Sequence, residues 1–256
     1  MGDYRAARIE ERLAERSDWT LEAVHEMHMD VHSKQAERFM AILRPLLPCG
    51  ERAAVLRNWD CRYDPASHGA ELFERFYRKL LLDAYGTACG PNVPRYLLEQ
   101  TAIVAGFFAN LDRVLLDRDG AWFPAGGRDA AFRRAAEHAL ATPSRAWSER
   151  QQFTFKHLML GGRLPRWMGF DRGPFPLRGG RATIHQGQVF RQRGRETSWA
   201  PSYRLATDLA EPVAHTALAG GPSDRRFSGW YANEIQDWLD GRTKQLSPAR
   251  RNTQEG

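Results

Sequence analysis

The sequence predicts an α+β protein with helices in the first half of the chain and strands in the second. Up to about residue 160, apolar residues recur at the three- and four-residue spacing of a helix. From about Gly161, glycine, proline and arginine become frequent, and short segments alternate apolar and polar residues with the period of a strand. We therefore expect a helical region at 1–160, a strand-rich region at 161–246 and a flexible polar tail at 247–256.

One long helix is predicted over residues 20–47. Its apolar residues keep to a single face across the whole range, and Thr20 is a suitable N-cap. Pro45 and Pro48 end the pattern. The other helices are predicted to be shorter. Ser67 is expected to cap a helix that reaches Leu81 and stops at Gly86 and Gly90. The remaining predicted ranges are 3–16, 94–117, 128–141, 144–160 and 231–239.

Three strands are predicted, at 181–190, 202–209 and 212–219. In the first, Ala182, Ile184 and Gln186 alternate with Thr183 and His185. Three short strands alone make a poor sheet, because their edges are left unpaired. We therefore expect these strands to need partners from elsewhere.

Length and composition limit the classes of function. A chain of 256 residues with 42% hydrophobic residues can bury a sizeable core. The net charge is +6, but acidic residues are mixed with the basic ones along most of the chain, so we expect no nucleic-acid partner. There is no apolar run of about 18 residues and no signal-peptide pattern, so no membrane partner is expected. The three cysteines form no CxxC pair, which argues against a zinc knuckle or a disulfide framework.

Three histidines share one stripe of the long predicted helix. His25, His28 and His32 are spaced i, i+3 and i+7, and imidazoles at such spacing can bind a transition metal. The zinc-protease pattern H-E-x-x-H needs histidines four apart, whereas the first two here are three apart. His28 also lies on the apolar face, where a hydrogen-bonded core histidine is the competing interpretation. We assign no metal ligand, and a metal-binding protein using these residues stays open as an alternative.

Common catalytic signatures are missing: the sequence has no G-x-S-x-G, P-loop or G-x-G-x-x-G. The Gly179–Gly180 pair lacks the Lys-Ser/Thr of a phosphate loop and leads into a predicted strand, so no helix N-terminus is offered to an anion. The small-residue segment 218–228 is either a glycine corner at the end of a strand or a close backbone approach to a catalytic centre.

Six segments form a recognisable series. They are DYRAARIEERL (3–13), MDVHSKQAERF (29–39), LRNWDCRYDPASHGAELFERFYRKLL (56–81), GPFPLRGGRATIHQG (173–187), SYRLATDLAE (202–211) and LAGGPSDRRFSGWYANEIQDWLDGRTKQL (218–246). In this order they resemble the penicillin acylase (penicillin amidase) family of N-terminal nucleophile hydrolases. The resemblance extends over nearly the whole chain, but only over about the C-terminal half of the family's large chain.

The resemblance implies a four-layer αββα core that this chain would form only in part, and hydrolysis of linear amides by acyl transfer. The family's precursor cuts itself to expose a serine, or another small nucleophile, at the N-terminus of the large chain. Its α-amine is the base, and an Asn side chain with a backbone N–H forms the oxyanion hole. That Asn is expected upstream of Asp3, and Gly2 has no side chain to act as a nucleophile. We therefore expect no catalytic residue in this chain and no activity of the chain alone.

Ligands and partners are implied by the same resemblance. Arg5 aligns with a family arginine near the acyl-transfer site that holds a substrate carboxylate or orders the oxyanion-hole neighbourhood. Its alternative is a surface arginine at a helix start. No cofactor is expected here, since the calcium ligands of some relatives lie mostly upstream. The expected partners are the small chain, the N-terminal part of the large chain and an amide substrate, in a periplasmic or secreted enzyme linked to antibiotic biosynthesis.

The chain departs from the family pattern at several positions. Arg181 and His185 stand where many relatives have Asp and Asn, and residues 220–224 read GGPSD where the family has Gly-Gly-x-Ser-Gly. Without neighbouring strands, the segments 181–190, 202–208 and 212–219 are expected to expose apolar edges and make the isolated chain poorly soluble or partly disordered. A non-catalytic binding or scaffold protein that keeps the fold is the other alternative.

Overall fold

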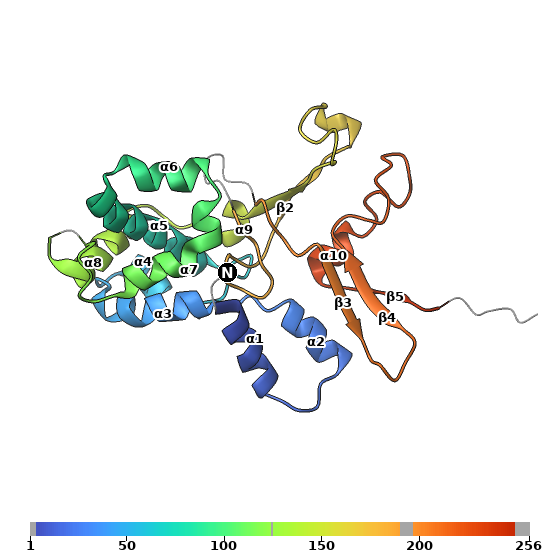
Figure 1. The fold of residues 1–256 in the computed structure, drawn as a ribbon, viewed down its shortest axis with the longest axis horizontal. Coiled ribbons are helices and arrows are strands. Elements are labelled where there is room, and N and C mark those ends of the chain that lie inside the picture. The colour runs from blue at the N-terminus through green and yellow to red at the C-terminus, as the bar shows by residue number, and fades with distance from the viewer. Residues whose placement is uncertain (1–3, 124, 190–196, 249–256) are drawn as a thin grey trace, which may run out of the picture. The chain divides into compact units, whose positions relative to one another are not determined.

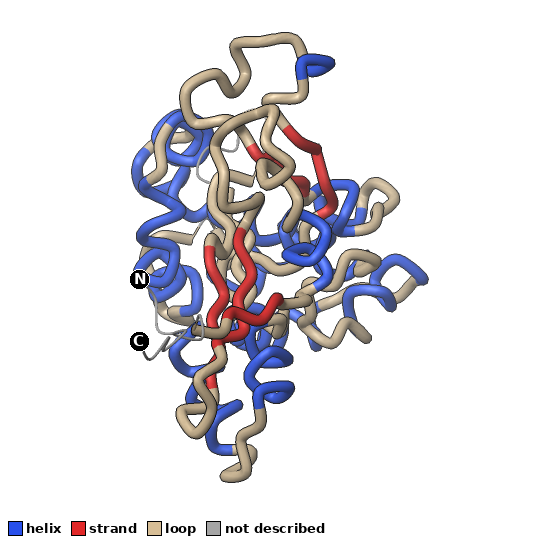
Figure 2. Tube along the Cα trace, turned by 90° about the vertical axis from the view of Figure 1, so that its right-hand side faces the viewer, coloured by secondary structure: helices blue, strands red, loops and turns tan. Residues whose placement is uncertain are grey.

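The computed structural model describes residues 4–123, 125–189 and 197–248, which form two compact units. Unit 1 comprises Met1–Glu15, Asp30–Thr154 and Pro174–Ala200, and unit 2 comprises Arg16–Met29, Phe155–Gly173 and Pro201–Gly256. Most helical residues precede most strand residues along the chain (Figure 1). Helices and strands occur together, which confirms the predicted mixture of the two (Figure 2). The division of the chain at 160 and 246 stays a prediction, and the tail from 249 lies outside the described residues.

Unit 1 is built from helices around α5 (His68–Cys89), the longest of those described. The hydroxyl of Ser67 accepts a hydrogen bond from the Ala70 N–H at 3.2 Å, as the predicted N-cap requires. The helix continues past Gly86 and ends at Gly90, where φ is +84°. The other helical elements of unit 1 are α1 (Tyr4–Ala14), α3 (Lys34–Leu43), η1 (Arg44–Leu46), α4 (Glu51–Arg57), α6 (Asn92–Gln100), α7 (Ile103–Leu116), α8 (Gly127–Leu140) and α9 (Trp147–Arg150).

The core of unit 1 is an aromatic cluster between α3, α5 and α8. Phe39 of α3 stacks on Phe132 of α8 with ring centroids 6.1 Å apart, and Phe76 of α5 meets Phe132 edge to face at 5.3 Å. Helix α8 also presents buried alanines, whose small side chains let it lie close to α5 (Ala131, Ala135, Ala136 and Ala139). This packing holds α5 in place, and α5 carries Glu74 and Tyr77 of the candidate site.

Unit 2 contains a three-stranded antiparallel sheet in the order β3-β4-β5. Strands β3 (Tyr203–Thr207) and β4 (Ala214–Leu218) confirm two of the predicted strands, and β5 (Lys244–Leu246) pairs with the other side of β4. Helix α10 (Ile235–Asp240) buries Trp238, whose indole N–H donates to the Pro201 carbonyl at 2.8 Å. Helix α2 (Leu21–His28) packs against β3.

The prediction of one helix over 20–47 is wrong, because the chain breaks between α2 and α3. Helix α2 starts after Thr20 as predicted, but the Asp30 carboxylate accepts from the His32 N–H at 2.7 Å, and the Ser33 hydroxyl caps α3. Such side-chain bonds to backbone compete with helical ones. The Val31 carbonyl also accepts from the Tyr63 N–H at 3.0 Å, which holds this stretch extended.

The predicted helix at 144–160 is also wrong beyond Arg150. A four-residue helix, α9, is followed by β1 (Gln152–Phe155), which pairs with β2 (Arg172–Pro176); η2 (Arg166–Met168) lies between them. The alternation of Phe153 and Phe155 with Gln152 and Thr154 has the period of a strand.

The predicted helix at 94–117 is two helices, α6 and α7. The hydroxyl of Thr101 donates to the Leu97 carbonyl at 2.7 Å and accepts from the Ile103 N–H at 3.3 Å, so it ends one helix and starts the next. The apolar α7 spans only 14 residues. Among the residues that the structure describes, no helix combines the length and apolarity needed to span a membrane.

Candidate functional site

The segment predicted as a strand at 181–190 is instead a buried loop in unit 1; residue 190 lies outside the described residues. We call residues 179–188 the buried loop, since all of them except Arg181 are buried. Its shape is set by Thr183, whose hydroxyl accepts from the Gly180 N–H at 2.9 Å and donates to the His185 carbonyl at 2.6 Å. These local bonds replace the ladder of a strand, and His185 is therefore not at a strand position.

The glycine pair brings two stretches of backbone together. Gly179 has a φ of +81°; its N–H donates to the Tyr63 carbonyl at 2.9 Å, and its carbonyl accepts from the Trp147 indole at 2.9 Å. A Cβ at this position would lie 1.9 Å from the His185 carbonyl oxygen. The glycine is thus required by close packing within the protein.

Replacing Gly179 with alanine is expected to destabilise unit 1, whereas Gly90→Ala, in the same unit, is the matched control. Both positions have a positive φ, but a Cβ at Gly90 would meet open space. The two variants therefore share a left-handed penalty of about 1 kcal/mol and differ by the clash in the buried loop, for which we expect about 2 kcal/mol more in Gly179→Ala. Urea unfolding of the two variants measures the difference. Equal losses would contradict the assigned role of Gly179.

A buried carboxylate, Asp112 of α7, lies at the centre of a polar network beside this loop. It accepts hydrogen bonds from the Tyr4 hydroxyl at 3.0 Å, the Gln35 amide at 2.7 Å and the Tyr77 hydroxyl at 2.7 Å. Burial raises the pKa of Asp112 to about 6, although the three donors and Arg181 act in the opposite direction. Asp112 thus joins α1, α3 and α5 at one point.

A second carboxylate, Glu74 of α5, forms a buried ion pair with Arg181 of the buried loop. Glu74 also accepts from the Tyr63 hydroxyl at 3.0 Å, and the Arg181 guanidinium lies 4.4 Å from the centre of the Tyr77 ring. Burial lowers the pKa of Arg181, but Glu74, Tyr77, Tyr63 and Asp112 together outweigh this and the net direction is upward. The guanidinium is charged and fixes the loop to α5.

A small cavity of about 30 Å³ adjoins this ion pair. Polar side chains line part of it, among them Glu74, Gln151 and Arg181. The Gln151 amide nitrogen is buried and has no hydrogen-bond partner among the described residues. A polar space of this size has room for about two waters, which is too little for an amide substrate.

Arg5 of α1, predicted from the family resemblance, points to the buried loop. Its guanidinium donates to the Gln186 side-chain oxygen and to the Ile184 carbonyl, both at 3.3 Å. Burial lowers the pKa of Arg5. The side chain is thus half-buried against the loop, in an environment unlike that of a surface arginine.

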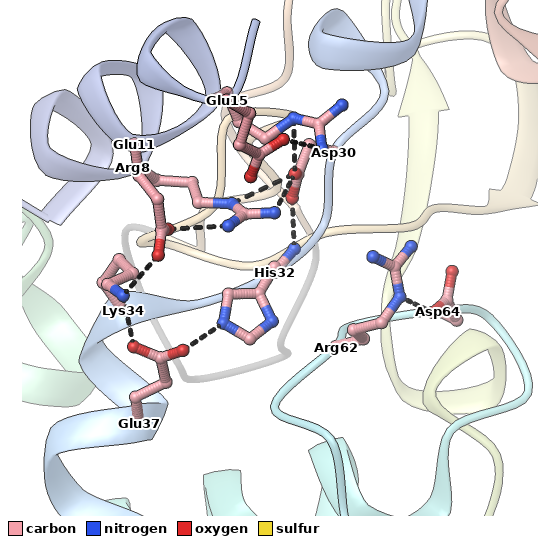
Figure 3. A network of polar contacts seen from close by, with 10 residues as sticks. Arg8, Glu11, Glu15, Asp30, His32, Lys34, Glu37, Arg62 and Asp64 are labelled. Atoms are coloured by element: carbon pink, nitrogen blue, oxygen red, sulfur yellow. Dashed lines mark hydrogen bonds and ion pairs between the residues drawn. The ribbon is translucent and has the colours of Figure 1, made fainter.

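A charged network fastens α1 to the break between α2 and α3 (Figure 3). The Arg8 guanidinium donates twice to the Asp30 carboxylate, at 2.7 and 3.1 Å. The Asp30 carbonyl accepts from the His185 N–H at 2.9 Å, so one residue contacts both α1 and the buried loop. Lys34 and Glu37 of α3 extend the network, and Glu37 lies 2.6 Å from the His32 imidazole.

The three histidines considered as metal ligands do not share a helix. His25 and His28 lie on α2 in unit 2, whereas His32 follows the break and belongs to unit 1. The premise of a single helical stripe is therefore wrong. Within the described residues, no three His, Cys, Asp or Glu side chains are placed so that they could hold a metal ion.

A sequence model of the penicillin amidase family matches residues 2–255. The chain belongs to the penicillin amidase family. It is similar in structure to the thermostable penicillin G acylase from Alcaligenes faecalis, with a TM-score of 0.59 and 13% sequence identity. The similarity covers 97% of this chain and 51% of that one, so this chain spans about half the length of the relative. Among curated proteins no match was found.

Proposed function

We propose that this chain is the C-terminal portion of the large chain of a penicillin-acylase-like amidohydrolase. The observation that carries the proposal is the family match over residues 2–255 together with the structural similarity to half of an acylase chain. In the proposed reaction, an N-terminal nucleophile outside this chain adds to an amide carbonyl, the amine leaves with a proton, and water then hydrolyses the acyl-enzyme. The described residues supply the frame around that centre.

The proposed four-layer core requires partner strands for unit 2. Among the described residues, β3 and β5 are the outer strands of their sheet, and β3 leaves Tyr203 and Leu205 about half exposed. The outer backbone edge of such a strand pairs readily with another strand. We assign that strand to the N-terminal part of the large chain or to the small chain; any calcium ion of the whole, periplasmic or secreted enzyme would likewise be held there.

A second surface of unit 2 supports the proposal that this chain binds a partner. The loops 157–170 and 224–231 are held together by a hydrogen bond from the Arg226 guanidinium to the Met168 carbonyl at 2.9 Å. They expose large apolar side chains (Leu158, Met159, Trp167, Phe227 and Trp230). Soluble monomers rarely leave so many apolar side chains together in water. The remainder of the enzyme is the partner we propose for this surface.

The isolated chain is expected to have no amidase activity. Purified chain incubated with acetyl-, hexanoyl- and phenylacetyl-p-nitroanilide should release p-nitroaniline no faster than buffer, because the nucleophile is proposed to lie outside it. Protein purified from its natural source should instead contain a large chain that begins with serine or another small nucleophile and ends with this sequence, as mass spectrometry can establish. Turnover by the isolated chain, or a natural polypeptide without that upstream half, would overturn the proposal.

We propose that Arg5 orders the neighbourhood of the oxyanion hole. Its contacts with Ile184 and Gln186 support this role over direct binding of a substrate carboxylate, because two of its nitrogens already donate within the protein. In the complete enzyme, Arg5→Lys should lower kcat by about a hundredfold for substrates with and without a carboxylate, since it loses the planar fork. Arg12→Lys on the same helix is the control. A loss confined to the KM of carboxylate-bearing substrates would instead assign Arg5 to substrate binding.

A further inference from the structure

A cluster of basic side chains lies where α2 packs on the sheet of unit 2. The rings of His25 and His28 are 6.3 Å apart, and the ring of His215 from β4 lies 5.8 Å from that of His25. The Nε2 atom of His25 and the Nδ1 atom of His28 are buried and make no hydrogen bond with any described residue. Arg204 of β3, also buried, adds a permanent charge nearby.

The charges around this cluster are unbalanced. Glu22, on the exposed side of α2, is the carboxylate that acts on His25 and His215. The carboxylates of the other elements are engaged elsewhere: Glu234, before α10, pairs with Lys244 of β5, and Asp237 and Asp240 of α10 pair with Arg242. Glu26 of α2 acts on Arg16. Protonated His25 and His28 would therefore lie near the Arg204 charge, with one exposed carboxylate to balance them.

We propose that this cluster makes the packing of α2 on the sheet acid-labile, so that protonation of His25 and His28 releases α2. Repulsion between like charges in a partly buried site opposes that packing. Helix α2 lies in the segment Arg16–Met29 of unit 2, which in the sequence follows α1 and precedes α3. Its release would free this segment from the sheet of unit 2. A bound metal is not the basis of the effect, since the described side chains form no metal site.

The direction of the effect follows from the histidine pKa values. Burial, followed by the neighbouring cations, lowers the pKa of both His25 and His28 below the ordinary 6.5. The unfolded segment therefore binds protons more readily than the folded one. The stabilisation from the neutral imidazoles is complete above pH 6.5 and is lost as the pH falls through the folded-state values.

Hydrogen exchange of the full chain between pH 7.5 and 5.0, corrected for the intrinsic rate at each pH, tests the proposal. We expect the protection of α2 at pH 5.0 to be lower than at pH 7.5, by about tenfold for each unit of pKa depression. The double variant His25→Gln/His28→Gln should abolish this dependence. His138→Gln, an exposed histidine of α8, should leave it unchanged.

Four results would overturn the proposal. One is protection of α2 that does not change with pH in the wild-type chain, and another is an unchanged slope in the double variant. Should that variant fail to fold, NMR titration of the wild-type imidazoles decides, and a His28 that titrates at 6.5 or above contradicts the proposal. Stoichiometric zinc binding that is lost in His215→Ala would assign the cluster to a metal instead.

Discussion

Replacing Arg181 with methionine is expected to lower the free energy of unfolding by about 3–5 kcal/mol at pH 7. Glu74 is only 3% exposed. Its carboxylate would keep the Tyr63 hydroxyl and the field of Arg150 but lose its ion pair with Arg181. Removing one partner of a buried ion pair carries a penalty of this size. The variant also loses the guanidinium over the Tyr77 ring. Urea unfolding followed by near-ultraviolet circular dichroism measures the change.

Two controls separate this effect from a general loss of charge. Arg242→Met makes the same substitution at an exposed arginine, which pairs with Asp237. We expect this variant to lose less than about 1 kcal/mol of its free energy of unfolding. In the double variant Glu74→Gln/Arg181→Met the buried charge is gone, so the double variant should be more stable than Arg181→Met alone. Additive losses in the double variant would show that the ion pair is not what holds the buried loop.

Local sequence signals predicted the elements that local interactions fix. The caps at Thr20 and Ser67 need only a hydroxyl and an N–H three residues later, and both were found where the sequence placed them. Strand β3 alternates buried and exposed side chains over consecutive residues, so its period was visible as well.

Two of the wrong predictions concern segments with partners that are distant in sequence. The break at Asp30 depends in part on a backbone hydrogen bond between Val31 and Tyr63, which no window around residue 30 contains. The buried loop alternates like a strand, but the backbone of Gly179 is held by Tyr63 and Trp147. The alternation in this segment was real, but tertiary contacts determined the backbone conformation instead.

The candidate site was predicted only in part. Arg5 was selected through the family resemblance, whereas its partners in the buried loop were not predicted. Glu74 and Asp112 were missed, although each carried a usable signal: an acidic residue on the apolar face of a predicted helix. Glu74 stands between Phe73 and Phe76, and such a carboxylate must be paired or hydrogen-bonded if the helix is buried.

Replacing Asp112 with asparagine is expected to remove a pH-dependent loss of stability of about 3 kcal/mol. Burial raises the pKa of Asp112 to about 6 from an ordinary value of 3.8, a difference of about 2 units, and each unit corresponds to 1.36 kcal/mol. Below pH 3.8 the carboxyl is protonated in both the folded and the unfolded chain. Between 3.8 and 6 the unfolded chain ionises first, so Asp112 reduces stability as the pH rises through this window.

The neutral amide of Asp112→Asn does not ionise. As the pH is raised from 3.8 to above 6, the free energy of unfolding of the variant should therefore rise by about 3 kcal/mol relative to that of the wild type. Taking the difference between the two proteins at each pH cancels the titration of all other groups, including the histidines of unit 2. Asp117→Asn, an exposed position next to the end of the same helix, should show no such trend. A difference between wild type and Asp112→Asn that is the same at pH 4 and pH 7 would mean that Asp112 is ionised without penalty. Its three donors, from Tyr4, Gln35 and Tyr77, would then fully offset its burial.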